Sequence, residues 1–453
     1  MAEIAPFRAL RYDPQRVPDL APVVTPPYDV ISPEAQERYH ARHPYNVVRL
    51  VLPKDAGQGT GEPSRYARAG AAFASWQAEG ILRRDAEPAL YLSEQTFSLG
   101  SPGPGRRVRR CGVMAMVRLA EYEERLILPH ERTFAKYKAD RLALMHAAPA
   151  NLEAIFGFYP GPAEPVGGIV GRHMAGQPAV ELADEDGTRQ RLWVLHDRGD
   201  VRAITEALRE RPIIIADGHH RYETALQFRA ERRAAAGASA QAERRPHEFL
   251  LMHLTCAEDP GLVILPTHRL IRQRPALERG ALPGALGRFF RIETRPLDSR
   301  TPALSVPPVL AELAERRRET TAFAVYAGGS ELLLLTLHDR GVVDEFLRQG
   351  HSPTYARLDV AILHRLVIEQ ILGVGPTGAP DDAIGYTRDE VQAVQAVASG
   401  EAHLALFQNP PEVSQVEAIA RGGERMPQKS TYFYPKLLSG LVISPLDPSE
   451  TIG

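Results

Sequence analysis

Hydrophobic and polar positions follow two different periods along this chain. Short apolar or alternating runs typical of strands occupy residues 89–97, 111–119, 154–159, 191–197, 212–216, 248–255, 321–327, 331–337 and 403–409. Apolar positions with helical spacing occupy residues 68–82, 200–211, 308–318, 358–372 and 388–400. Because the two kinds of run are interleaved throughout, the pattern predicts an α/β fold with mixed sheets and interleaved helices.

The chain of 453 residues is too long for one ordinary core, so we expect two or three subdomains. Segments rich in proline and glycine near residues 159–168 and 272–284 indicate the boundaries. They predict an N-terminal α/β region over 1–165, a central region over 166–275 and a C-terminal α/β region over 276–453. The segment 98–108 is also rich in glycine and proline, but it lies between two strand-like runs and predicts a hairpin loop.

Composition limits the possible partners. A formal net charge of -2, with 24% charged and 44% hydrophobic residues, gives no basic excess and argues against nucleic acid binding. The longest apolar runs have strand length, and the first residues lack the pattern of a secretion signal, so we expect a cytoplasmic protein without a membrane partner. Cys111 and Cys256 are far apart and form no CxxC pair, which favours buried thiols over a disulfide or a zinc ribbon.

The clearest chemical signal is the segment "RPIIIADGHHRYETALQF", residues 211–228. A short β-branched run precedes "DGHH", and Tyr222, Ala225 and Leu226 follow with helical spacing, which predicts a strand-to-helix turn. The predicted turn places His219, His220 and Arg221 at the N-terminus of a helix.

A helix N-terminus attracts anions, because its first backbone N–H groups lack partners within the helix and the dipole is positive there. Cationic side chains at this end disfavour the helix unless an anion is present. Gly218 would allow a ligand to approach the backbone closely. We therefore interpret residues Asp217 to Arg221 as a site for a phosphate or a carboxylate.

Two other interpretations remain open for this turn. Asp217 is a good N-cap residue, so the segment is also compatible with a capped helix that carries solvated histidines. A metal site would combine His219 or His220 with His130 or His268, but adjacent histidines point in divergent directions and no HExxH pair is present. We assign no metal ligands. No GxxxxGK[ST] motif occurs, so a Walker-type site is not expected.

The string "DGHHRYETAL" resembles the phosphate-binding box of the ParB/sulfiredoxin superfamily, in which a Gly-x-His-Arg turn opens a helix and holds nucleotide phosphates. Free-serine kinases within that superfamily carry a nearly identical string. The resemblance implies that one subdomain is ParB/sulfiredoxin-like. Sulfiredoxin has its reactive cysteine where this chain has His219, so sulfiredoxin chemistry is not implied.

A second resemblance extends along nearly the whole chain, to a prokaryotic family of proteins of unknown function, DUF1015. The ordered segments that carry it are "TPPYDVIS", "HPYNVVRL", "LPHERTFAKYKADRL", "ADGHHRYETAL", "LPTHRLI", "LDVAILHRLVIE" and "MPQKSTYFYPKLLSGLVI". The family name implies no mechanism, so the chemistry has to come from the residues.

The serine kinases that the chain resembles have a His-Glu pair upstream of the phosphate box, and its Glu is the candidate general base. His130 and Glu131 match that pair in type and in order. A carboxylate within hydrogen-bond reach of a hydroxyl can accept its proton during phosphoryl transfer. The same segment is also compatible with a solvated loop of alternating charges.

Other charged residues are candidates for contacts with phosphate. Lys138 and Arg141 follow Glu131 closely, and Lys429 and Ser430 belong to the string "MPQKSTYFYPKLLSGL". Aromatic residues in that string, and Tyr28 near the N-terminus, are more typical of packing. His364 lies in an apolar stripe and is more typical of a core histidine, whereas His268 and Arg269 end a strand near which a site contact is possible.

The function predicted from these residues is a nucleotide-dependent phosphotransferase that converts free L-serine to O-phosphoserine. Glu131 and His130 would act in catalysis, Asp217 would act there and as an indirect Mg²⁺ ligand, and the turn would hold the phosphates of ATP or ADP. The alternative is a regulatory protein that binds a nucleotide or a phosphate through the same turn without turnover. Neither the acceptor nor the oligomeric state is specified by the sequence.

Overall fold

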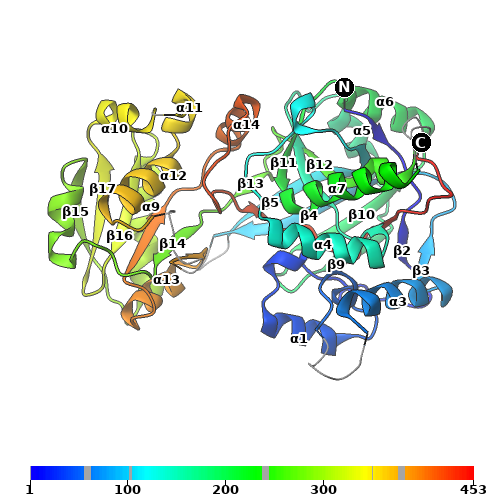
Figure 1. Cartoon of the computed structure of the whole chain (residues 1–453), viewed down its shortest axis with the longest axis horizontal. Coiled ribbons are helices and arrows are strands. Elements are labelled where there is room, and N and C mark those ends of the chain that lie inside the picture. Colours follow the sequence, from blue (N-terminus) through cyan, green and yellow to red (C-terminus); the bar gives the residue numbers. More distant parts are fainter. Residues whose placement is uncertain are drawn as a thin grey trace. The chain divides into compact units, whose positions relative to one another are not determined.

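The chain folds into two compact units in the computed structural model of the protein (Figure 1). The structure describes residues 2–55, 63–100, 105–236, 244–348, 350–375 and 383–452. The first unit comprises Met1–Pro129, Thr133–Val263 and Pro435–Gly453, and the second comprises His130–Arg132 and Ile264–Tyr434. Both units combine helices with sheets, which confirms the α/β class.

The first unit is built on a nine-stranded sheet with the strand order β6-β11-β8-β12-β5-β4-β10-β9, in which β1 also pairs with β5. The strands of the first unit are β1 (Ile4–Ala5), β2 (Leu10–Tyr12), β3 (Leu82–Arg84), β4 (Leu90–Leu99), β5 (Arg106–Arg118), β6 (Ile127–Leu128), β7 (Ala150–Asn151), β8 (Ile155–Tyr159), β9 (Val180–Ala183), β10 (Arg189–Leu195), β11 (Ile213–Asp217), β12 (Phe249–Cys256) and β21 (Ser444–Pro445). Of these, β2 pairs with β3 and β7 pairs with β21 outside the nine-stranded sheet. The helices of the first unit are α1 (Pro33–Arg42), α2 (Val48–Val51), α3 (Arg65–Ala78), α4 (Ala135–Ala147), α5 (Val166–Met174), α6 (Arg198–Arg209) and α7 (His219–Ala236).

Side chains of the central strands alternate between two cores, as the period of a strand requires. Leu92, Val113 and Met252 pack with residues of α5 and α6 on one face of the sheet. On the other face, Tyr91 and Met114 pack with residues of the C-terminal segment, Pro435–Gly453, among them Leu441 and Val442. The C-terminal segment therefore belongs to the same core as the central strands.

The expected regions 1–165 and 166–275 both contribute strands to this one sheet. Strands β11 and β8 pair with each other although they come from the two sides of residue 165. The proline-rich segment after β8 leads into α5, which packs back onto the same sheet. A local turn signal does not reveal whether the next elements begin a new core. Most of both regions lies in the first unit, whereas residues 130–132 and 264–275 belong to the second.

The second unit contains a six-stranded sheet with the order β15-β17-β16-β19-β14-β18. The strands of the second unit are β14 (His268–Ile271), β15 (Phe290–Pro296), β16 (Ala322–Tyr326), β17 (Glu331–Leu337), β18 (Ile384–Thr387), β19 (Leu404–Gln408) and β20 (Phe433–Tyr434). The chain passes from the first unit to the second at β13 (Val263–Ile264), which pairs with β20. The helices of the second unit are α8 (Leu282–Leu286), α9 (Pro302–Arg316), α10 (Arg340–Leu347), α11 (Pro353–Ala356), α12 (Asp359–Ile362), α13 (Glu390–Ala398) and α14 (Val413–Gly422). Helices α9 and α13 cover one face of this sheet.

Two local predictions have different outcomes. The hairpin expected over 98–108 is present, since β4 and β5 pair antiparallel with Leu99 opposite Arg106, although its tip at 101–104 lies outside the described residues. The helix expected over 358–372 is α-helical only in α12 and continues as a π-helix over Leu363–Ile371. Within the described ranges, no helix has the length and apolar character needed to cross a membrane.

Candidate functional site

The predicted strand-to-helix turn is present in the first unit. Strand β11 ends at Asp217 after four buried residues, and helix α7 begins at His219. Gly218 between them has a φ of +99°, in the left-handed region that glycine adopts without strain. The interpretation of this segment as a strand, a turn and a helix is therefore confirmed.

The Asp217 carboxylate in this turn bridges two cations. Its Oδ1 accepts a hydrogen bond from Lys436 Nζ at 2.7 Å, and its Oδ2 accepts one from Arg221 Nη2 at 3.1 Å. Burial alone would raise the pKa of Asp217, but the charges of Lys436 and Arg221 outweigh it and lower this pKa to about 2. Asp217 is therefore ionised at neutral pH, and it neutralises cations that would otherwise be available to an anionic ligand.

Arg221 is held from two further sides. Its Nη1 donates to the carbonyl oxygen of Ala154 at 2.9 Å. Burial would lower its pKa, but the nearby Glu153 and Asp217 carboxylates raise it. The Glu153 Oε1 accepts hydrogen bonds from the Tyr28 N–H and the Ser439 hydroxyl, both at 3.0 Å. Glu153 is thus a fixed second carboxylate near the turn.

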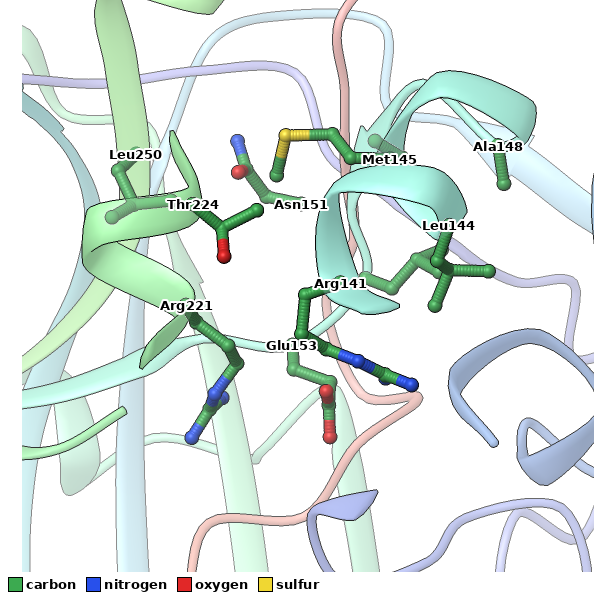
Figure 2. A pocket seen from close by; sticks show the side chains of 11 residues that line it. Arg141, Leu144, Met145, Ala148, Asn151, Glu153, Arg221, Thr224 and Leu250 are labelled. Carbon is green, nitrogen blue, oxygen red and sulfur yellow. The ribbon is translucent and has the colours of Figure 1, made fainter. Parts of the chain in front are cut away.

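A cavity of about 50 Å³ opens beside this group of charges (Figure 2). Arg221 and Thr224 from α7 line it, together with Arg141 from α4 and Glu153, whose carboxylate lies between the two guanidinium groups in this view. Arg221 and Glu153 also line a second cavity, and Asp217 is part of its lining. The turn therefore adjoins space lined by charges of both signs, which suits a ligand that is polar and small.

The two histidines of the turn have different surroundings. His219 is buried, with 6% of its surface exposed, so the interpretation as a pair of solvated histidines does not hold for it. The Nε2 of His220 accepts a hydrogen bond from the Phe134 N–H at 3.0 Å. The His220 ring also stacks on the Phe134 ring, with 6.2 Å between centroids. His220 therefore fixes the residue that precedes α4.

Lys138 and Arg141 lie on α4 in the same unit, and both have carboxylate partners. Lys138 Nζ is 2.8 Å from Glu223 Oε2. Arg141 Nε donates to Asp140 at 2.7 Å, and the guanidinium lies 3.9 Å from the centre of the Tyr28 ring. Arg141 lines the cavity, whereas Lys138 contacts an acid of α7.

The other predicted residues form a separate group within the second unit. The Oε1 of Glu131 accepts a hydrogen bond from the Lys429 N–H at 3.1 Å, and His130 Nε2 lies 2.8 Å from the Thr431 hydroxyl. Lys429 has a φ of +53°, which is uncommon for a residue with a side chain. The hydroxyl of the buried Ser430 donates to the Pro427 carbonyl oxygen. The predicted site residues thus divide into one group in each unit.

Arg269 joins the second group and is fully buried. Its Nη2 donates to the Lys429 carbonyl oxygen at 3.2 Å, and its Nε donates to His364 Nε2 at 3.2 Å. Burial, with the charge of Arg269, holds the pKa of His364 well below its usual value, so His364 is a neutral acceptor. His364 is half-buried, as expected of a core or boundary histidine. His268 and Arg269 begin strand β14 and do not end a strand, so that expectation is wrong, and a site contact at Arg269 stays a prediction.

Among the residues that the structure describes, no three His, Cys, Asp or Glu side chains are grouped so that they could hold a metal ion. The alternative that joined His219 or His220 to His130 or His268 as metal ligands thus gains no support. Burial lowers the pKa of His268 to about 3, and its Nδ1 accepts from the Gln408 N–H at 3.5 Å.

The family described as "Protein of unknown function (DUF1015)" matches residues 4–361. The chain belongs to this family. The match includes the Asp217–Arg221 turn and ends before the segment that contains Lys429 and Lys436. The comparison with curated proteins finds no match.

Several solved structures resemble this chain only distantly. A conserved hypothetical protein from Pyrococcus furiosus has 11% identity and a TM-score of 0.30, and the match covers 72% of this chain and 93% of that one. A free serine kinase in complex with AMP has 11% identity and a TM-score of 0.33, with 75% and 93% covered. SbnI from Staphylococcus aureus, truncated at its C-terminus, has 12% identity and a TM-score of 0.31, with 74% and 87% covered. At these values the likenesses carry no argument about function, and the ParB/sulfiredoxin-like subdomain stays a prediction.

Sequence reasoning missed two members of the site in this DUF1015 protein. Lys436 lies in the string "MPQKSTYFYPKLLSGL" but was not predicted as a site residue, and neither was Glu153. Glu153 comes just before β8, in the segment "NLEAIF", where an acid among apolar residues is the only signal. For Lys436, the available signal is a lysine two residues after Tyr434, at the start of an apolar segment.

Gly218→Ala should destabilise the protein by about 1–2 kcal/mol, because a residue with a side chain is strained at positive φ. A Cβ at this position would also lie 3.1 Å from Arg221 Nη2 and would press on the guanidinium. Urea denaturation measures the effect. Gly171→Ala is the matched control, because a Cβ there meets nothing within 4 Å and alanine favours the helix. Equal stability of the two variants would contradict the strain argument.

Proposed function

We propose that this chain is a nucleotide-dependent phosphotransferase that acts on a small hydroxyl substrate, free L-serine, with ATP or ADP as the donor. The observation that carries the proposal is the convergence of Arg221 and Lys436 on one carboxylate at the N-terminal end of α7. Two side chains that hold a carboxylate by charge-assisted hydrogen bonds also suit a phosphate oxygen.

The local geometry supports a phosphate at this turn in three ways. The N-terminus of α7 carries the positive end of the helix dipole. Gly218 has no side chain that would occupy the approach to the backbone. Arg221 and Lys436 supply two cations that are mostly buried, with 11% and 10% of their side chains exposed, so that solvent screens their charges little.

The proposed chemistry requires Asp217 to release its cations when phosphate binds. A phosphate oxygen accepts from Lys436 and Arg221 in place of Asp217. Asp217 would then help to hold a nucleotide-bound Mg²⁺ indirectly, and that ion would neutralise phosphate charge. The hydroxyl oxygen of serine attacks the terminal phosphorus, and Glu131 accepts the proton of that hydroxyl. ADP leaves when ATP is the donor, and AMP leaves when ADP is the donor.

A regulatory protein that binds nucleotide without turnover is the second candidate. The specific observation in its favour is that Arg221 and Lys436 are already paired with the Asp217 carboxylate. A sensor would need only a phosphate group that replaces the Asp217 carboxylate at Arg221 and Lys436. This exchange requires no general base.

The test incubates the purified chain with Mg²⁺, L-serine and either ATP or ADP, and detects O-phosphoserine by mass spectrometry. We expect product with one donor at least, and its loss in Lys436→Met. The matched control is Lys54→Met, which removes a lysine that pairs with Glu37 at the surface. Nucleotide binding by calorimetry without any product would favour the regulator, and the absence of both would refute a nucleotide site.

A further inference from the structure

A pair of buried polar side chains lies on the face of the main sheet that also carries the C-terminal segment. Gln95 on β4 and Arg110 on β5 stand directly opposite each other in the antiparallel register. Their exposed fractions are 3% and 1%. Along its strand, Gln95 is an even number of residues from Tyr91, and Arg110 is an even number from Met114. Both side chains therefore point to the same face as Tyr91 and Met114, toward the core that includes Leu441. Both are thus buried on the face that also carries the buried, hydrogen-bonded pair Ser93 and His253.

These two side chains bind two consecutive carbonyl groups of the C-terminal segment. Gln95 Nε2 donates to the carbonyl oxygen of Lys436 at 3.1 Å. Arg110 Nη2 donates to the carbonyl oxygen of Pro435 at 2.6 Å and also to the Gln95 side-chain oxygen. The Arg110 guanidinium lies over the Phe156 ring, 4.4 Å from its centre. The backbone on both sides of the Lys436 Cα is therefore fixed to the sheet.

We propose that Gln95 and Arg110 are positioning residues, which fix the backbone of Lys436 so that its ammonium group meets the Asp217 carboxylate. A lysine side chain has about 2 kcal/mol of rotamer entropy, so a free lysine would hold an acid only loosely. Fixing its backbone on a rigid sheet reduces the number of positions that the ammonium group can reach. The 2.7 Å contact with Asp217 is the result.

The cost of this arrangement argues against a role in packing alone. Burial lowers the pKa of Arg110 to about 9, since a guanidinium loses hydration there. An apolar pair on the facing strands would fill the same space without that cost. The two donors are instead directed at the carbonyl groups of the residues from which Lys436 extends, where the chain re-enters the first unit at Pro435.

The first experiment measures how fast an amine-acylating reagent modifies Lys436, by peptide mass spectrometry, with the exposed Lys136 as the internal reference. Gln95→Glu keeps the acceptor for Arg110 but replaces the donor to the Lys436 carbonyl by a carboxylate oxygen. We expect modification of Lys436 to rise about fivefold relative to Lys136, the change that one lost hydrogen bond implies. An unchanged rate in a folded Gln95→Glu protein would overturn the proposal.

The matched control is Gln408→Glu in the second unit. Gln408 is equally buried, and its Nε2 donates to the Thr267 carbonyl oxygen at 3.2 Å, so the same type of bond is lost. We expect no change at Lys436 in this variant. If it raises the modification of Lys436 as much as Gln95→Glu does, the effect is one of general stability and the positioning role is refuted.

The second experiment rests on the proposed function and uses calorimetric titration with ATP and with ADP. Gln95→Glu should weaken binding about fivefold in the wild-type background and not at all in Lys436→Met, because the residue acts only through Lys436. An equal loss in both backgrounds would contradict positioning. Absence of nucleotide binding by the wild type would refute the proposed function and leave the acylation result intact.

Discussion

Asp217→Asn should lower the free energy of unfolding by about 2 kcal/mol at pH 7, which follows from the depressed pKa of this carboxyl group. The folded-state pKa is about 2, because Lys436 and Arg221 stabilise the ionised form more than burial disfavours it. Asparagine has nearly the same shape but no charge, so both cations would lose their counter-ion in a mostly buried place. Urea denaturation followed by circular dichroism measures the change.

The pH dependence of this difference identifies its cause. Because the folded-state pKa lies below the unfolded value of about 3.9, the folded chain binds fewer protons between these values and is stabilised above them. The contribution is complete above about pH 5 and disappears as pH falls through about 2. The stability difference between wild type and Asp217→Asn should therefore shrink on going from pH 5 to pH 3.

Asp55→Asn is the control for a general effect of removing an acid. Asp55 pairs with Arg65 at 3.0 Å, but 77% of its side chain is exposed, so the variant should change stability by less than about 1 kcal/mol. A difference between wild type and Asp217→Asn that stays constant from pH 5 to pH 3 would show that ionisation of Asp217 is not the source of its stabilisation.

Local sequence predicted the turn because the signals for it are adjacent along the chain. The buried run of β11, Gly218 and the helical spacing after it lie within one segment of the sequence. The contact between Lys436 and Asp217 could not be predicted from local sequence, because the two residues are 219 positions apart and only the fold of the C-terminal segment brings them together. Gln95 and Arg110 lie on different strands, and only the strand register makes them opposite neighbours.

The second group shows the same limit. The pair His130 and Glu131 was predicted from its order along the chain, but the partner of Glu131 is the backbone of Lys429, 298 positions later. The segment that carries His364 was predicted as a helix from its apolar spacing, and the structure makes it π-helical over Leu363–Ile371, a rare form that such a pattern does not specify. Contacts between distant segments depend on topology, which periodicity does not specify.

Glu131→Gln should lower the rate of serine phosphorylation by a factor of about 10²–10⁴, the usual contribution of a general base. Glutamine keeps an oxygen that accepts the Lys429 N–H, so the local backbone should be retained. Glu131 is not among the residues proposed to hold phosphate, so we expect the affinity for nucleotide to stay within about twofold. Initial rates of O-phosphoserine formation and calorimetry measure the two quantities.

Glu417→Gln is the matched control for Glu131→Gln, because it removes an acid of the second unit that pairs with Arg421 on the surface of α14. We expect the rate to be unchanged in this control. A full rate in Glu131→Gln would remove the base from the proposed mechanism and assign Glu131 a structural role at Lys429. A rate loss accompanied by an equal loss of affinity would instead mean that Glu131 contributes to binding. Only a loss of rate with intact affinity supports proton transfer, because a base acts on the transition state and not on the bound nucleotide.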